Sequence, residues 1–138
     1  MSQRNIQITE LDRKRLLDLI LDAQSGEYRK SVYLENLRGE LERAQIVPSQ
    51  DIPDNVITMN STVTLIDLDT NEEETYTLVY PEHADTSQGK ISILAPVGTA
   101  MLGYQVGDVF EWDVPAGKRR LRVKEIHYQP EASGNLDL

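Results

Sequence analysis

The side chains with the greatest potential for chemistry are carboxylates at two predicted turns. Asp22 and Glu27 flank the turn-forming pair Ser25-Gly26, and Asp69 precedes the acidic run Glu72–Glu74. Carboxylates three residues apart can bind one cation across a turn, but Asp22 and Glu27 are five residues apart, and the second group matches no calcium-binding loop. We therefore interpret both groups as solvated loop acids and predict no metal site.

Other residue types that carry catalysis are scarce. Cysteine is absent, which excludes disulfides and thiolate metal sites. The two histidines, His83 and His127, show no metal-ligand spacing, and the sequence contains no catalytic triad, phosphate-binding glycine loop or dinucleotide-binding motif. We predict a protein that is not an enzyme and that needs no cofactor.

The charge distribution indicates the kind of partner. The net charge is −9; residues 48–117 carry Lys90 as their only basic side chain, whereas residues 118–124 contain Lys and Arg but no acid. A mainly acidic surface repels phosphate backbones, so we expect no tight nucleic-acid binding and favour a protein partner with basic surfaces. We interpret the cluster 118–124 as a source of cross-strand ion pairs, with acidic partner elements or nucleic acid as alternatives.

Two amphipathic segments must position the first pair of acids. Thr9 and Asp12 form a shortened capping box before an apolar stripe that runs to about residue 23. A second helix is predicted over about residues 31–46, with a coiled-coil-like seam that Gly39 weakens. The seam consists of Leu34, Leu37, Leu41 and Ala44. A short connection predicts an antiparallel helical hairpin whose arms are only about 22–24 Å long.

A β pattern follows residues 48–55, a polar segment with two prolines that we interpret as a linker. Apolar residues alternate from about residue 63, and residues 97–103 are expected to form one short helix. These patterns predict an α+β protein in which an antiparallel sheet surrounds that helix. The predicted divisions are a hairpin over residues 1–47, the linker, and a domain over residues 56–138.

The last predicted hairpin can be given a register from its side chains. Pairing Asp113 with Arg120 and Glu111 with Arg122 places opposite charges together and apolar residues on the other face. This register leaves the four-residue loop Pro115–Lys118, which is a permitted hairpin length.

The most informative segment, residues 91–108, reads Ile-Ser-Ile-Leu-Ala-Pro-Val-Gly-Thr-Ala-Met-Leu-Gly-Tyr-Gln-Val-Gly-Asp. It predicts a buried strand, an Ala-Pro entry into one helical turn, and a Gly-Asp turn into the next strand. Together with Asp113–Lys118 and Glu125–Tyr128, it resembles the C-terminal domain of the Gre transcript-cleavage factors. Thr58–Ser61, Leu78–Pro81 and Tyr128–Ala132 resemble the shorter Gre relatives called regulators of nucleoside diphosphate kinase.

The resemblance implies an FKBP-like fold and bacterial RNA polymerase as the partner. It implies that the loop Leu94, Ala95, Pro96, Val97 and Gly98 docks on the rim of the polymerase secondary channel, although Ala95 replaces the serine usual in the family. The hairpin tip, with Asp22, Glu27 and Tyr28, would face the channel. Gre factors with an Asp-x-x-Glu-Asn tip deliver a second Mg²⁺ for transcript hydrolysis, and this sequence lacks that spacing.

We therefore predict a transcription regulator that binds RNA polymerase and competes with Gre-type factors without stimulating transcript cleavage. Since the sequence shows no signal peptide and no membrane-length apolar segment, we expect a cytoplasmic protein with no membrane partner. One alternative is a cleavage factor that delivers Mg²⁺ through the tip acids. The other is an FKBP-like peptide-binding module, for which the single Phe and single Trp leave few pocket residues.

Overall fold

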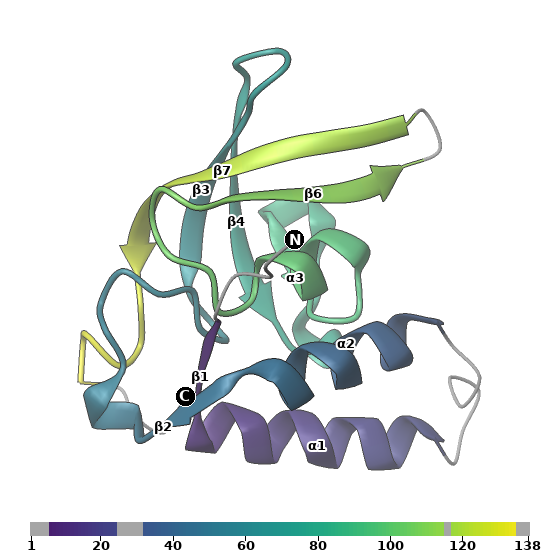
Figure 1. Ribbon diagram of the computed structural model, residues 1–138, viewed down its shortest axis with the longest axis vertical. Helices are drawn as coiled ribbons and strands as arrows, with labels where there is room; N and C mark the ends of the chain where they lie inside the picture. Colours follow the sequence, from purple (N-terminus) through teal and green to yellow (C-terminus); the bar gives the residue numbers. More distant parts are fainter. Residues whose placement is uncertain (1–5, 25–31, 115–116, 135–138) are drawn as a thin grey trace.

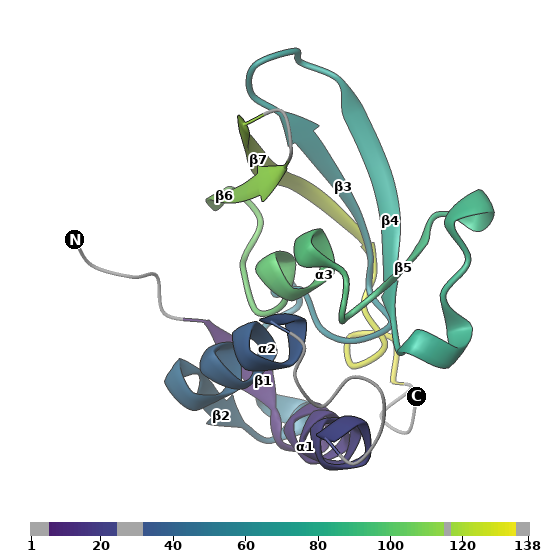
Figure 2. The same cartoon turned by 90° about the vertical axis from the view of Figure 1, so that its right-hand side faces the viewer.

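The computed structural model describes residues 6–24, 32–114 and 117–134. A layer of two helices lies against a twisted sheet, with a short helix between them (Figures 1 and 2). The predicted α+β class is confirmed. No helix within these ranges is long and apolar enough to cross a membrane.

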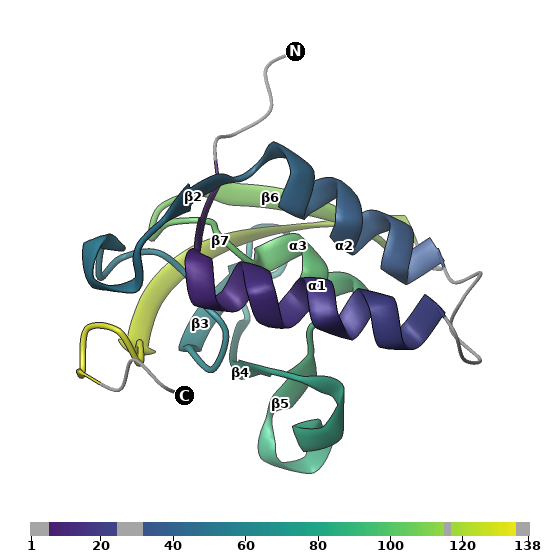
Figure 3. The ribbon, with the colours of Figure 1, turned by 90° about the horizontal axis from the view of Figure 1, so that it is seen from below.

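The helical layer begins and ends with a short strand. Its elements are β1 (Gln7–Thr9), α1 (Glu10–Gln24), α2 (Val32–Arg43) and β2 (Gln45–Val47). The Asp12 N–H donates to Thr9 Oγ1 (3.0 Å), so the predicted cap of α1 is present. The two helices lie side by side and run in opposite directions (Figure 3). The prediction that the second helix reaches residue 46 is wrong, because the β-branched pair Ile46-Val47 joins a parallel pairing of β2 with β1.

The larger sheet has five strands in the order β5-β4-β3-β7-β6. They are β3 (Thr62–Asp67), β4 (Glu73–Val79), β5 (Lys90–Ser92), β6 (Val109–Val114) and β7 (Gly117–Tyr128), and α3 (Pro96–Met101) follows β5. The expectation of an antiparallel sheet is wrong at one edge, where β5 runs parallel to β4. A parallel neighbour requires a crossover connection, which residues 80–89 supply through the 3₁₀ turns Pro81–His83 and Thr86–Gln88.

The β6–β7 hairpin is paired two residues away from the predicted register. Glu111 lies opposite Arg120 rather than Arg122, and Asp113 lies opposite Lys118 rather than Arg120. The pairing runs through Val114 and Gly117, so the connection is residues 115–116 and not the four-residue loop. Gly117, the first residue of β7, has a φ of 132°, which favours glycine. Because side chains alternate with period two, a slip of two keeps every residue on its predicted face.

The helical layer and the sheet share one hydrophobic core. Its buried members include Leu16, Ile20, Leu37 and Leu41 from the helices, Val63, Leu65 and Leu78 from the sheet, and Val97 and Met101 from α3. The segment between the layers also packs on the molecule, since Ile52 is buried and the Gln129 amide donates to the carbonyls of Pro53 (2.8 Å) and Val56 (2.7 Å). These contacts fix the helices relative to the sheet.

We expect Gly39→Ala to raise the free energy of unfolding by about 1 kcal/mol, because glycine is a poor helix former. Gly39 is exposed within α2, and an added Cβ would meet no atom within 4 Å. Urea unfolding followed by circular dichroism measures the change. The contrasting variant is Gly98→Ala, whose Cβ would lie 2.2 Å from the Ser92 carbonyl oxygen and should destabilise the protein. A neutral or destabilising Gly39→Ala would contradict the helical environment described for this position.

Candidate functional site

The predicted docking loop, residues 94–98, joins β5 to α3 in a conformation that its own hydrogen bonds define. The Leu94 N–H donates to Ser92 Oγ (3.0 Å), and the Ala95 N–H donates to the Ser92 carbonyl (3.0 Å). Thr99 Oγ1 donates to the Ile93 carbonyl (2.5 Å) from within α3. Leu94 and Ala95 are half-buried, whereas Val97 and Gly98 are buried. Leu94 and Ala95 are therefore the loop residues whose described side chains a partner can reach.

Gly98 permits the close approach that shapes this loop. An added Cβ would lie 2.2 Å from the Ser92 carbonyl oxygen and 3.1 Å from the Ser92 carbonyl carbon. These atoms belong to backbone, which cannot turn aside as a flexible side chain can. A residue larger than glycine would push β5 and α3 apart at this point.

Ala95 occupies the N-cap position of α3 and supplies no side-chain hydrogen bond to it. Its backbone is extended (φ −70°, ψ 148°), as is usual for an N-cap residue, and Pro96 opens the helix. The Ser92 hydroxyl bonds to Leu94, one residue before the cap. The helix start thus depends on backbone geometry and on Pro96.

The structure places one of the three predicted tip residues. Asp22 is exposed near the C-terminal end of α1, where it lines a pocket with Tyr80 and Glu82. Glu27 and Tyr28 lie outside the described residues. The described part of the chain contains no group of three or more His, Cys, Asp or Glu side chains that could hold a metal ion.

The N-terminal end of α1 is held by a hydrogen bond to a buried carboxyl group. Asp12 is only 2% exposed, and its Oδ2 accepts a hydrogen bond from the Met59 N–H (3.1 Å). Thr58 Oγ1 in the same turn donates to Glu131 Oε1 (2.8 Å), beyond the end of β7. The sequence singled out Asp12 as a capping residue and Thr58–Ser61 as a family motif. It gave no signal that the two segments meet, because they are 47 residues apart.

The environment of Asp12 changes its acidity. Burial raises the pKa of Asp12 from 3.8 to about 7, the Met59 N–H opposes that rise, and the charge of Glu131 adds to it. Near neutral pH this carboxyl group therefore exists in both protonation states, unlike an ordinary aspartate.

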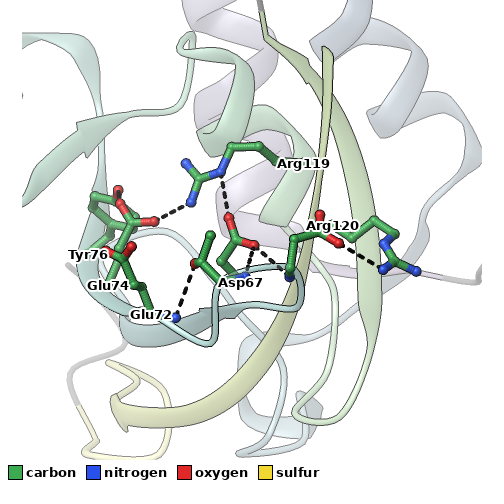
Figure 4. A network of polar contacts seen from close by, with 8 residues as sticks. Asp67, Glu72, Glu74, Tyr76, Arg119 and Arg120 are labelled. Carbon is green, nitrogen blue, oxygen red and sulfur yellow. Dashed lines mark hydrogen bonds and ion pairs between the residues drawn. The ribbon is translucent and has the colours of Figure 1, made fainter. Parts of the chain in front are cut away.

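The basic cluster 118–124 forms ion pairs, and the described ones join it to acids of the two strands on the β3 side of β7 and of the turn between them. Arg119 contacts Asp67 (3.0 Å) and Glu74 (2.5 Å), and Arg120 contacts Asp69 (3.0 Å) (Figure 4). Lys124 pairs with Glu73 (2.5 Å). Among the described side chains, the ion-pair partners come from β3, the β3–β4 turn and β4, and the sheet order puts β7 beside β3.

Hydrogen bonds around this network also lower the pKa values of its carboxyl groups. The backbone N–H of Asp69 and then the Arg119 guanidinium hold the pKa of Asp67 below its ordinary value. Burial alone would raise the pKa of Glu74, but hydrogen bonds from Tyr76 and Arg119 bring it below its ordinary value. Asp69, Glu73 and Glu74, which we interpreted as solvated loop acids, thus have cationic partners.

Known proteins with this fold define its class. A helical pair, a central short helix and a mixed sheet with a preformed β5–α3 loop make a GreA-like α+β fold. The solved prokaryotic transcription elongation factor GreA/GreB from Nitrosomonas europaea is similar, with a TM-score of 0.71 and 43% identity over 91% of this chain and 100% of that one.

Sequence comparisons identify the family. Residues 52–128 match the family described as transcription elongation factor GreA/GreB, C-terminal, and residues 4–47 match the regulator of nucleoside diphosphate kinase (Rnk) N-terminus. The regulator of nucleoside diphosphate kinase of Escherichia coli K12 is 40% identical over 98% of both chains. A transcription elongation factor GreA from a Chelativorans strain is 31% identical over 85% of this chain and 84% of its own. The chain belongs to the GreA/GreB family, as its sequence motifs predicted.

We expect Ala95→Ser to stabilise the protein by about 1 kcal/mol, because a hydroxyl at the N-cap can accept a free N–H of the first helical turn. Thermal and urea unfolding measure this change. Ala95→Val is a control that adds bulk at the same position without an acceptor, and it should give no stabilisation. A serine variant no more stable than the valine variant would contradict the capping geometry.

Asp12→Asn tests the buried carboxyl group. Folding raises the pKa of Asp12 from 3.8 to about 7, so between these values the folded protein binds the proton more tightly than the unfolded chain. The contribution of Asp12 to stability is therefore greatest at low pH and falls as pH rises from about 4 to about 7. The amide of the variant cannot titrate, so the stability difference between wild type and variant should move in favour of the variant across this window.

The measurement is a set of urea unfolding curves for both proteins from pH 4 to pH 8. Carboxyl groups with lowered pKa, such as Asp67 and Glu74, titrate equally in both proteins and cancel in the difference. A difference that does not change with pH would show that Asp12 has an ordinary pKa.

Proposed function

We propose that this protein is a transcription regulator that binds bacterial RNA polymerase at the secondary channel. There it competes with Gre-type factors and does not stimulate transcript cleavage. The observation that carries the proposal is the similarity over both parts of the chain, with the Rnk N-terminus over residues 4–47 and the GreA/GreB C-terminal family over residues 52–128. The cytoplasmic location and the FKBP-like architecture predicted from the sequence belong to the same proposal.

The loop 94–98 supports the docking part of this proposal. Hydrogen bonds from Leu94 and Ala95 to Ser92, and from Thr99 to Ile93 across the base of the loop, hold it in place, so binding requires little ordering of the chain. Leu94 and Ala95 offer a small apolar contact to the channel rim, while the net charge of −9 favours a basic protein surface. Residues 56–138 act here as the docking domain.

The length of the helices supports binding without cleavage. The 15 residues of α1 span about 22 Å, which is short for an arm that must reach a deep active site. Residues 1–47 would then occupy the channel mouth, with the linker 48–55 joining them to the docking domain. Competition needs only a shared footprint, and the binding free energy determines how much Gre factor is displaced.

The test is a transcript-cleavage assay on backtracked elongation complexes of bacterial RNA polymerase. We expect no cleavage with this protein alone, and a dose-dependent loss of cleavage when it is titrated against a Gre factor. Cleavage by the protein alone would overturn the proposal in favour of a cleavage factor whose tip acids carry Mg²⁺.

Two matched variants test the docking loop in the same assay. Ala95→Arg puts a large cation on the loop and should reduce competition at least about tenfold, since it disturbs a packed contact. Ala132→Arg makes the same chemical change at an exposed site outside the loop and should compete as wild type does. Equal competition by both variants would exclude the loop from the interface.

A further inference from the structure

A pocket of about 340 Å³ opens between α1 and the segment that follows β4. It is lined by Arg15, Asp18, Leu19, Asp22, Tyr80 and Glu82. Residues 94–98 contribute none of this lining, whereas Asp22 of the predicted tip is part of it. Tyr80 belongs to Leu78–Pro81, one of the sequence motifs singled out above, and it lines one side of the pocket.

Helical spacing explains one side of this pocket. Residues 18 and 19 each lie three or four positions from residues 15 and 22, so the four form a single stripe along α1. The opposite side begins at Tyr80, where the chain leaves β4 and enters the 3₁₀ turn Pro81–His83. The shared core and the Asp12–Met59 hydrogen bond hold α1 against the sheet, so the two sides keep a fixed separation.

The lining determines which ligands fit. Three carboxylates and one guanidinium give the pocket a formal charge of −2 at neutral pH, which repels phosphate-bearing ligands such as nucleotides. Leu19 and the Tyr80 ring add apolar surface. The Tyr80 hydroxyl oxygen is buried, and it interacts with the Arg15 guanidinium of the same lining. The three carboxylates outnumber this one cation, and carboxylates beside an aromatic ring together recognise an arginine or lysine side chain.

We propose that this pocket receives a basic side chain of RNA polymerase when the protein is bound, an inference that rests on the proposed function. Asp22 belongs both to the pocket and to the predicted channel-facing tip, so the pocket lies where the arm would meet the channel mouth. The charge of the chain points the same way, because an acidic protein binds best where its partner is basic. The pocket thus gives the arm an anchor separate from the docking loop.

The test compares the affinity of full-length variants for core RNA polymerase. In Asp18→Asn/Glu82→Gln, two exposed carboxylates become amides of the same shape, and we expect about tenfold weaker binding at low salt. The difference should shrink as salt rises, because salt screens exposed charges. Asp54→Asn/Glu72→Gln is the matched control, since it makes the same two chemical changes at exposed sites outside the pocket, residues 1–47 and the docking loop. The control should bind within about twofold of wild type.

A second variant keeps the inference testable if the double variant is unstable. Glu82 is exposed in a 3₁₀ turn, so Glu82→Arg should fold normally, which a thermal melt checks. It places a cation at the pocket and should weaken binding more than Glu82→Gln does. If wild type fails to bind polymerase, the proposed function itself is wrong. If wild type binds and the pocket variants bind as tightly as the control, only the pocket inference is overturned.

Discussion

The hydrogen bond between the Asp12 side chain and the Met59 N–H joins the helices to the turn before β3, and together with the shared core it holds the two layers in place. The turn that contains Met59 bonds to two other parts of the chain. Asn60 and Ser61 exchange backbone hydrogen bonds with Leu78 in β4 (2.6 and 3.0 Å), and Thr58 binds Glu131. One buried side chain of α1 is thereby connected to the start of β3, the end of β4 and the segment after β7. A carboxylate in this position costs desolvation energy, and its raised pKa reflects that cost.

This junction determines where the accessible parts of the molecule lie relative to one another. Val97 and Met101 of α3 share the core with Leu37 and Leu41 of α2, and Figure 2 shows α3 lying directly between the helical layer and the sheet. The loop 94–98 and the pocket beside α1 are therefore built on one packed unit. Their spacing follows from side-chain packing, which tolerates little adjustment.

Local sequence patterns predicted much of the fold, but they did not predict which residues distant in the chain pair with each other. The Thr9 cap and the strand-helix-turn segment at 91–108 could be predicted because their determinants lie within a few residues of each other. The β6–β7 register could not, because alternation fixes the face of each residue but not a slip of two. The cationic side chains of β7, Arg119 and Arg120, pair with β3, the turn after it and β4, and their partners depend on strand order. The Asp12–Met59 hydrogen bond could not be predicted for the same reason. Asp12 and the motif that contains Met59 were both singled out from the sequence, but only the fold brings them together.

The order β5-β4-β3-β7-β6 leaves the sheet open on both sides, and an open sheet can recruit a strand from another copy. At one border β5 is only three residues long, and both 3₁₀ turns of the 80–89 connection pack beside it. At the other border β6 carries the exposed carboxylate Glu111. Short length and charge are common protections against edge-to-edge aggregation, and the net charge of −9 adds repulsion between copies. The acidity that suits a basic partner therefore also favours colloidal stability at high concentration.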